Sequence, residues 1–389
     1  MSDPLQDSAT DLQTAQATPL PAAGATVAGS AARLPVPVPI GEQSWPEGTA
    51  PLVSICCITY NHGPFIRQCL DGFLMQETTF PVEILVYDDA STDDTAAVIR
   101  EYAQRHPGLF KPILQTKNQH SKGIKPNPTF NYPRAQGDFI AFCEGDDFWV
   151  RSDKLLRQVE FLEKNPTYSL CWTRFETLDH VTGRRERDGN DRWFVEPGGC
   201  QFGFHEFCTG WHMGTQTLVF RREAMNFSSF NNRAFRDIFL VSDLLTWGDG
   251  YCLPDTMAVY RIHEGGIHSS KSSHDKAAIA VDIYKEIYLA HRNNEALRDK
   301  YDQYCAKYIV ILLREHRHSD ALRLVAEFIA IAGWSSEYTK TPRVLSRIER
   351  RLRQLDQQIA TKNRELAAMK RGPLQRLRRM LDPIFSRIG

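Results

Sequence analysis

Two clusters of carboxylates follow two apolar runs in the first half of the chain. Asp88-Asp89 stands directly after Val82–Tyr87, and Glu144-Gly145-Asp146-Asp147 stands directly after Phe139–Cys143. Carboxylates packed so closely repel one another unless something positive lies among them, and a divalent cation with hard oxygen ligands, Mg²⁺ or Mn²⁺, meets that need. Such an ion completes its shell with substrate phosphates and water. The pattern predicts a metal-bound diphosphate, with Asp88 or Asp89 accepting hydrogen bonds from a base or ribose.

The same acidic loops have a simpler interpretation, because Asp commonly fills solvated turns. Two clusters that follow two buried strands weigh against that interpretation and favour a ligand site. The usual phosphate-binding loops are absent from the sequence, which has no GxxxxGK[ST] and no GxGxxG after its first apolar run.

The elements that must position these acids are short apolar runs rich in β-branched residues, which predict buried strands. They are Val53–Thr59, Val82–Tyr87, Leu109–Gln115 and Phe139–Cys143. Helical patterns separate the runs, with Pro64 placed for the first turn of one helix and Ser91 placed to cap the next. Strands that alternate with crossover helices indicate an α/β fold with a mainly parallel sheet flanked by helices. Ligands bind such sheets at the carboxyl ends of the strands.

Composition excludes several classes of protein. The chain has 389 residues, and its 47 Lys and Arg balance 47 Asp and Glu, whereas proteins that grip nucleic acid by its phosphates carry a basic excess. Its nine cysteines are odd in number and lack CxxC spacing, which fits neither a disulfide scaffold nor a zinc site and predicts reduced thiols. No targeting signal or bilayer-spanning apolar run stands out, so we expect a cytoplasmic protein.

Three stretches together resemble the family 2 glycosyltransferases, which are inverting, metal-dependent enzymes of the GT-A fold that use nucleotide-sugar donors. The stretches are VSICCITYN at 53–61, VEILVYDDASTDDT at 82–95 and GDFIAFCEGDDFW at 137–149. The resemblance covers about residues 51–265.

The resemblance implies roles for individual residues on the donor side. The residues that would line the nucleoside pocket are Thr59, Tyr60, Asp88 and Asp89. Glu144-Gly145-Asp146 stands where the family has its DxD, so Glu144 and Asp146 are the expected metal ligands, with Asp146 the direct one. Asp147 would lie beside them, towards the sugar.

The resemblance also implies a base and a closing segment. An inverting transfer needs a base for the acceptor hydroxyl, and the family takes it from an acid at the start of a downstream helix; the nearest match is Asp237, with Asp243 as its rival. Either could instead stabilise a helix dipole. Tyr260-Arg261-Ile262-His263 resembles the closing YRxH segment, in which Arg261 would meet the diphosphate and His263 the metal.

Trp211, Thr215 and Gln216 lie where such enzymes often shape the acceptor pocket, since aromatics and amides suit sugar recognition. Trp211 could equally belong to the core.

The chain divides by composition into four parts. Residues 1–50 are rich in Pro and Ala and predict a disordered tail, and 51–270 form the expected GT-A domain. Residues 271–339 predict a helical extension, and 340–389 hold 14 basic and 4 acidic residues in an amphipathic or coiled-coil pattern. That last part could lie on an anionic membrane, form a homodimer or pack on the catalytic domain.

The sequence thus predicts a glycosyltransferase that moves a sugar from a nucleoside-diphosphate donor, UDP-sugars being favoured, to a cell-surface glycan or lipid-linked acceptor. It would act in the cytoplasm, with contact at the inner face of the cell membrane left open, and without nucleic acid as a partner. Two alternatives remain open: a non-catalytic nucleotide-sugar-binding or scaffold protein of the same fold, and a sugar-phosphate nucleotidyltransferase. The nucleotidyltransferase should have a Gly-rich basic loop after the first strand, which TYNHGP at 59–64 is not.

Overall fold

The computed structural model describes residues 32–195, 198–232, 236–265, 271–292, 294–332, 357, 361 and 364. Within these residues, a sheet runs in the order β10-β12-β8-β11-β6-β2-β4-β5, with β7 paired to β12 and β9 to β8. The strands are β2 (Val53–Thr59), β4 (Val82–Asp88), β5 (Ile113–Leu114), β6 (Phe139–Glu144), β7 (Phe148–Trp149), β8 (Tyr168–Asp179), β9 (Arg185–Arg187), β10 (Cys200–Phe202), β11 (Val219–Arg221) and β12 (Asp249–Ile262).

The sheet has a parallel half and a mixed half. Strands β6, β2, β4 and β5 pair in parallel, as the βα alternation predicts. Beyond them β11 runs antiparallel to both β6 and β8, while β8 and β12 pair in parallel over a long register. The predicted α/β GT-A arrangement is confirmed, and the sheet is mixed because β11, β10, β7 and β9 pair antiparallel with their neighbours.

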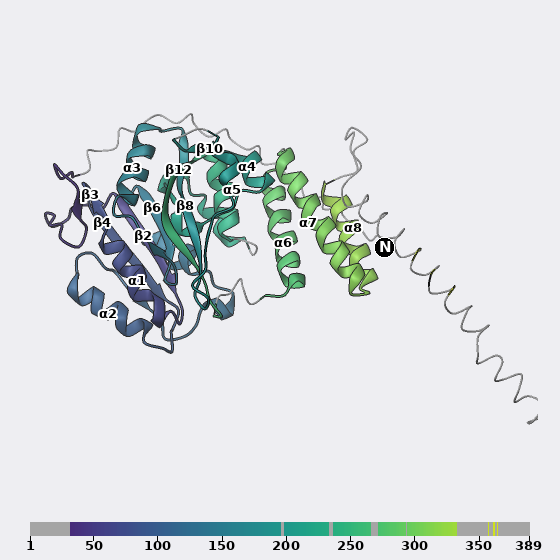
Figure 1. Ribbon diagram of the computed structural model, residues 1–389, viewed down its shortest axis with the longest axis horizontal. Helices are drawn as coiled ribbons and strands as arrows, with labels where there is room; N and C mark the ends of the chain where they lie inside the picture. The colour runs from purple at the N-terminus through teal and green to yellow at the C-terminus, as the bar shows by residue number, and fades with distance from the viewer. Residues whose placement is uncertain are drawn as a thin grey trace, which may run out of the picture. The chain divides into compact units, whose positions relative to one another are not determined.

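Helices flank this sheet. Helices α1 (Gly63–Leu74) and α2 (Thr95–Arg105) lie side by side along the half that contains β2 and β4 (Figure 1). Both α3 (Lys154–Lys164) and α5 (Asp237–Trp247) pack against β8. The short α4 (Phe204–Thr209) follows β10. The cap expected at Ser91 is wrong: α2 begins at Thr95, and the Ser91 hydroxyl donates to Asp88 instead.

The expected tail over 1–50 is wrong for residues 32–50. Strand β1 (Val38–Pro39) pairs with β3 (Glu77–Thr78), and Ile40 is buried. The Gln43 amide donates to the carbonyl oxygens of Val38 and Thr78, at 2.9 and 2.8 Å. A few specific contacts therefore order a stretch whose average composition predicts disorder. Residues 1–31 lie outside the described residues.

The predicted helical extension is present as α6 (Ser273–Ala290), α7 (Glu295–Arg314) and α8 (His318–Ala332). The Ser272 side chain caps α6 and the Asn294 side chain caps α7. One apolar core continues from the sheet, at Trp172, into these helices, at Tyr301. The basic segment 340–389 lies almost entirely outside the described residues. Within the part of the chain that is described, no helix combines the length and apolarity needed to cross a bilayer.

All nine cysteines are free thiols, as predicted.

A buried lysine gives the fold a pH-dependent stability. The Lys154 side chain is fully buried in α3, its Nζ donates to Gln158 Oε1 at 2.8 Å, and it lies 4.2 Å from the centre of the Trp149 ring. Burial lowers the pKa of Lys154 to about 7. The folded state therefore binds fewer protons than the unfolded state between about pH 7 and 10, so stability rises with pH across that range.

Replacing Lys154 with Met should stabilise the protein at pH 7 by on the order of 1–3 kcal/mol, because a buried charge is removed at the cost of one hydrogen bond. The gain should shrink as the pH approaches 10, where the wild-type amine is already neutral. Urea unfolding at pH 7 and pH 10 measures both values. Lys164→Met, on the exposed side of the same helix, is the control, and an equal effect of the two substitutions would contradict this assignment.

Candidate active site

The carboxyl ends of three neighbouring parallel strands bring the predicted donor residues to one edge of the sheet. Thr59 at the end of β2 is in register with Asp88 at the end of β4, and Ile58 is in register with Glu144 at the end of β6. The loop Glu144-Gly145-Asp146-Asp147 that ends β6 is called the acid loop here. It packs closely on β2, since a Cβ atom at Gly145 would lie 2.7 Å from Thr59 Oγ1. Glycine at this position lets the loop reach its place.

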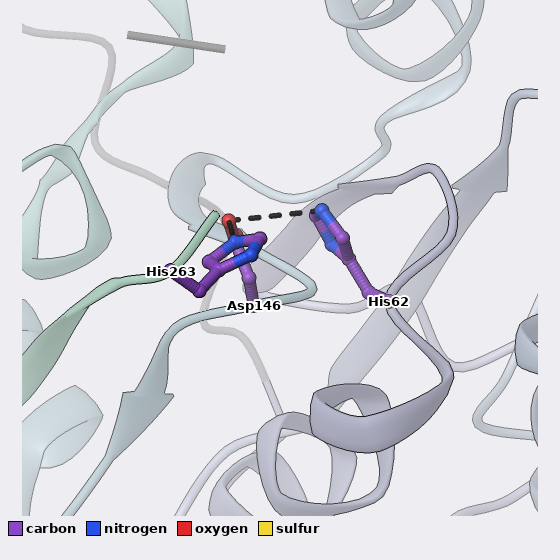
Figure 2. A group of neighbouring side chains, drawn as sticks. All are labelled: His62, Asp146 and His263. Atoms are coloured by element: carbon purple, nitrogen blue, oxygen red, sulfur yellow. Dashed lines mark hydrogen bonds and ion pairs between the residues drawn. The ribbon is translucent and has the colours of Figure 1, made fainter. Parts of the chain in front are cut away.

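Three side chains converge just beyond this edge. His263 Nε2 lies 3.0 Å from Asp146 Oδ2, and His62 Nε2 lies 3.6 Å from the same oxygen (Figure 2). His62 comes from the loop before α1, Asp146 from the loop after β6, and His263 from the end of β12. Segments far apart in sequence thus bring two imidazoles to one carboxylate.

This group fits a divalent cation. One ligand atom from each of the three residues lies within 4.8 Å of the others, and Asp146 Oδ1 and His62 Nδ1 are buried without a hydrogen-bond partner. Burial lowers the pKa of His62, which favours the neutral imidazole that a metal requires. Burial opposes ionisation of Asp146, but its hydrogen bond to His263 and its interaction with His62 outweigh burial and lower its pKa. Two imidazoles and a carboxylate suit a first-row divalent ion.

Glu144 is not a member of this group of three, although its sequence position predicts a ligand. Burial raises the pKa of Glu144 well above its ordinary value, and the charges of Asp146 and Asp237 raise it further. The Glu144 carboxyl is therefore close enough to both Asp146 and Asp237 to interact with their charges.

Asp147 and Arg261 hold the acid loop to β12. Asp147 Oδ1 accepts a hydrogen bond from the backbone N–H of Arg261 at 2.8 Å, and Arg261 Nε donates to the carbonyl of Asp146 at 2.8 Å. A further Arg261 nitrogen donates to Gln68, and the guanidinium lies between the rings of Phe65 and Phe148. Both residues are predicted to meet the donor, and the contacts that the structure shows for them here are all within the chain.

The predicted nucleoside residues differ in how much they offer a ligand. Tyr60 is 43% exposed, so its ring is open for stacking, and Thr59 Oγ1 has no hydrogen-bond partner. Asp88 accepts hydrogen bonds from the backbone and hydroxyl of Ser91. Asp89 accepts three bonds, from the Tyr87 hydroxyl and from backbone N–H groups of the loop at 119–120. Asp89 is thus occupied in fixing that loop.

Asp237 is the first residue of helix α5, and its charge acts on Glu144. Its side chain is half-buried, and burial raises its pKa to about 6 against the opposing charge of Arg236. The rival Asp243 is buried, with Oδ1 3.5 Å from His291 Nε2. That contact gives Asp243 a place in the packing of α5 against the extension.

The three predicted acceptor residues have different surroundings in the structure. Trp211 is 8% exposed and stacks on Phe202 within the core, which is the alternative that the sequence left open for it. Thr215 and Gln216 begin a short 3₁₀ turn, and the Gln216 amide is fully buried with neither its nitrogen nor its oxygen hydrogen-bonded.

His62 is the member of the metal group that sequence reasoning missed. It stands in TYNHGP at 59–64, directly between β2 and α1, where a turn and a helix start explain every residue without a ligand role. Its position at the carboxyl end of the central strand is the signal that points to the site.

Replacing His62 with Phe should weaken Mn²⁺ binding at least as much as the loss of an outer-shell partner does, about 10–100-fold. Phe keeps a ring of similar shape and removes both nitrogens. Titration of Mn²⁺ into protein saturated with UDP, followed by electron paramagnetic resonance, measures the affinity. His180→Phe changes a nearby imidazole that packs on Phe65 outside the group of three, and comparable weakening by both variants would contradict the role of His62.

Comparisons with known proteins identify the family to which the chain is similar. Residues 54–226 match the family described as glycosyl transferase family 2. An uncharacterised protein of Mycobacterium tuberculosis is 33% identical over 254 residues, which cover 63% of this chain and 71% of that protein.

Two further proteins have named ligands or activities. The Escherichia coli UDP-Glc:alpha-D-GlcNAc-diphosphoundecaprenol beta-1,3-glucosyltransferase WfaP is 28% identical over 225 residues, covering 57% of this chain and 81% of WfaP. A structure of S. aureus TarS with UDP-GlcNAc aligns over 66% of this chain and 80% of that chain, with 17% identity and a TM-score of 0.47. From the family match and the relatives, this chain belongs to the family 2 glycosyltransferases and is a glycosyltransferase.

Proposed function

We propose that the chain is an inverting glycosyltransferase that moves a sugar from a nucleoside-diphosphate donor to a hydroxyl of a cell-surface glycan or lipid-linked acceptor. The observation that carries the proposal is the group His62, Asp146 and His263 at the strand ends, with Asp237 close enough to Glu144 for their charges to interact. A cation site and a base with a raised pKa are the two parts that a single displacement needs.

The donor would enter along the ends of β2 and β4. Tyr60 offers an exposed ring for a base, and Thr59 offers an unpartnered hydroxyl. UDP-sugars remain favoured, and the name of the E. coli relative supports both a UDP-sugar and a diphosphate-linked lipid acceptor.

The cation would be Mn²⁺ or Mg²⁺, held by His62, Asp146 and His263. When bound, it supplies charge that stabilises the departing diphosphate. Arg261 and Asp147 serve this site indirectly, because the bonds from Arg261 to Asp147 and to the Asp146 carbonyl keep the acid loop against the strand that precedes His263.

Asp237 would take the proton of the acceptor hydroxyl. Its pKa of about 6 leaves most of the carboxylate ionised at pH 7, yet makes it a stronger base than an ordinary Asp. The charge of Arg236 partly offsets the effect of burial on Asp237.

The remaining parts of the chain fit this proposal as follows. Residues 51–270 would form the catalytic domain and 271–339 an extension that packs on it. The basic segment 340–389 would bring the enzyme to the inner face of the cell membrane, where lipid-linked acceptors lie.

A thermal-shift panel of nucleoside diphosphates and their sugars, with and without Mn²⁺, tests the donor assignment. We expect at least one nucleoside diphosphate or its sugar to raise the melting temperature of the protein, and to do so only when Mn²⁺ is present. A ligand at 100 times its Kd stabilises the folded state by about 2.7 kcal/mol, which such a measurement detects. Stabilisation by no nucleoside diphosphate in the presence of Mn²⁺ would overturn the proposal.

A further inference from the structure

The loop that contains Gly189 and Asn190 is bonded to both the backbone and the ring of the exposed His212. The Asn190 side chain pairs with both backbone groups of His212: the His212 N–H donates to Asn190 Oδ1 at 2.8 Å, and Asn190 Nδ2 donates to the His212 carbonyl at 2.9 Å. The backbone N–H of Gly189 donates to His212 Nδ1 at 3.1 Å. Three bonds thus fix both the backbone and the ring of His212.

A buried ion pair between Arg174 and Asp188 holds this loop in place. Arg174 donates three hydrogen bonds to the carboxylate of Asp188, at 2.8–3.0 Å, and Asp188 is 2% exposed. The same carboxylate accepts from the backbone N–H groups of Phe175 and Asn190. A buried charge this fully hydrogen-bonded holds a rigid geometry, because removing any partner would leave it uncompensated.

The bond from Gly189 decides the tautomer of His212. Nδ1 accepts a hydrogen bond, so in the neutral ring the proton is on Nε2. The ring packs edge-on against Phe175, with 5.0 Å between centroids, while His212 as a whole is exposed. His212 therefore presents a fixed Nε2–H donor.

The segment that carries this donor is joined to the strands on either side of the acid loop. Phe175, on which the ring packs, is in register with Ala258, and Ala258 is in register with Trp149, which follows the acid loop by two residues. Trp149 Nε1 donates to the Gln216 carbonyl at 2.7 Å, and the Phe142 N–H, in the strand that leads into the acid loop, donates to the Leu218 carbonyl at 3.2 Å. The residues that follow His212 therefore contact the chain both before and after the acid loop.

We propose that His212 is a specificity-determining residue that donates a hydrogen bond from Nε2 to a hydroxyl of the acceptor sugar. The proposal rests on the proposed function, since it places the acceptor beside the metal site. The acceptor contact in this segment is then the exposed His212, and not the buried Trp211 that the sequence predicts. The ion pair of Arg174 and Asp188 acts through His212 by positioning it.

Two substitutions separate the donor from the loop contact. In His212→Asn, the side-chain oxygen can still accept from Gly189, but the outward N–H is lost. In His212→Gln, an amide reaches towards the place of Nε2, but the bond to Gly189 is lost. His205→Asn changes an exposed histidine on α4 and serves as the control.

The experiment measures binding of p-nitrophenyl glycosides of glucose, galactose, mannose and N-acetylglucosamine to protein loaded with UDP and Mn²⁺. The wild type should bind at least one glycoside. His212→Asn should weaken that binding about 10-fold, as expected for one lost hydrogen bond, His212→Gln should weaken it less, and His205→Asn should not change it. UDP affinity should be equal in all four proteins.

Two results would overturn the proposal while leaving the proposed function standing: equal glycoside affinity in wild type and His212→Asn, or no glycoside bound by wild-type protein that does bind UDP. A wild type that binds no nucleoside diphosphate with Mn²⁺ would instead count against the proposed function, and with it against the role of His212.

Discussion

Replacing Asp146 with Asn should lower the rate of sugar transfer by about 10³-fold or more, because the cation is expected to contribute several kcal/mol at the departing diphosphate. Both imidazoles approach the carboxylate of Asp146, whose second oxygen is buried without a hydrogen-bond partner. Asn keeps the shape of the side chain and removes its charge. Release of nucleoside diphosphate from the donor, measured with saturating Mn²⁺, reports the rate.

The folded state should survive this substitution, because the charge of Asp146 raises the pKa values of both Glu144 and Asp147 and its removal relieves that repulsion. A matched control is Asp153→Asn, which changes a carboxylate seven residues away that pairs with Arg151 at the surface. Transfer by Asp146→Asn within 10-fold of the wild type would rule out Asp146 as the centre of the metal group.

Replacing Asp237 with Asn should lower transfer by about 10²–10⁴-fold, the usual contribution of a general base, while donor affinity stays within a factor of two of the wild type. The wild-type rate should fall as the pH drops below about 6, where Asp237 becomes protonated. Rates and donor affinities measured from pH 5 to pH 8 test both statements.

Asp237→Asn should stabilise the folded protein although it lowers the rate of transfer. Because the pKa of Asp237 is raised in the folded state, that state binds more protons than the unfolded one between about pH 4 and 6, and above pH 6 the ionised carboxylate destabilises the fold. Asp237→Asn should therefore raise the free energy of unfolding at pH 7, and with it the melting temperature. The increase should be on the order of 1 kcal/mol, because the Asp237 side chain is partly exposed.

Asp243→Asn is the matched control for the base, since it lies on the same helix and contacts His291 instead of the site. It should alter stability and leave the acid limb of the rate profile unchanged. A profile whose midpoint near pH 6 persists in Asp237→Asn and disappears in Asp243→Asn would exchange the roles of the two residues.

The sequence predicts the parallel half of the sheet well because burial there is continuous. The runs that predict β2, β4 and β6 end within one residue of the strands in the structure, since each is buried almost throughout and bounded by a polar loop. Strand β5 is only Ile113–Leu114, within a longer predicted run, because that edge of the sheet is only partly covered.

The limits of prediction at the site have a physical cause. Sequence shows which side chains lie at the strand ends, but it does not show which donors and acceptors the fold itself consumes. Asp89 and Arg261 are both in the right place, yet backbone N–H groups and a carbonyl oxygen already occupy their polar atoms.

His62 shows that sequence can also miss a site residue, because its role depends on the close approach of Asp146 and His263, 84 and 201 residues further along the chain.

The order of residues 32–50 likewise depends on contacts with a distant part of the chain. Gln43 and Ile40 order that stretch through contacts with β3 that an average over composition does not register.

The central claim is that His62, Asp146 and His263 hold the cation that a nucleotide-sugar transfer requires. The most direct measurement is the release of nucleoside diphosphate from a panel of nucleotide sugars by wild type and Asp146→Asn, each with Mn²⁺ and with EDTA. We predict turnover of at least one donor by the wild type with Mn²⁺ and by none of the other three combinations. Equal turnover in EDTA, or by Asp146→Asn, would contradict the claim.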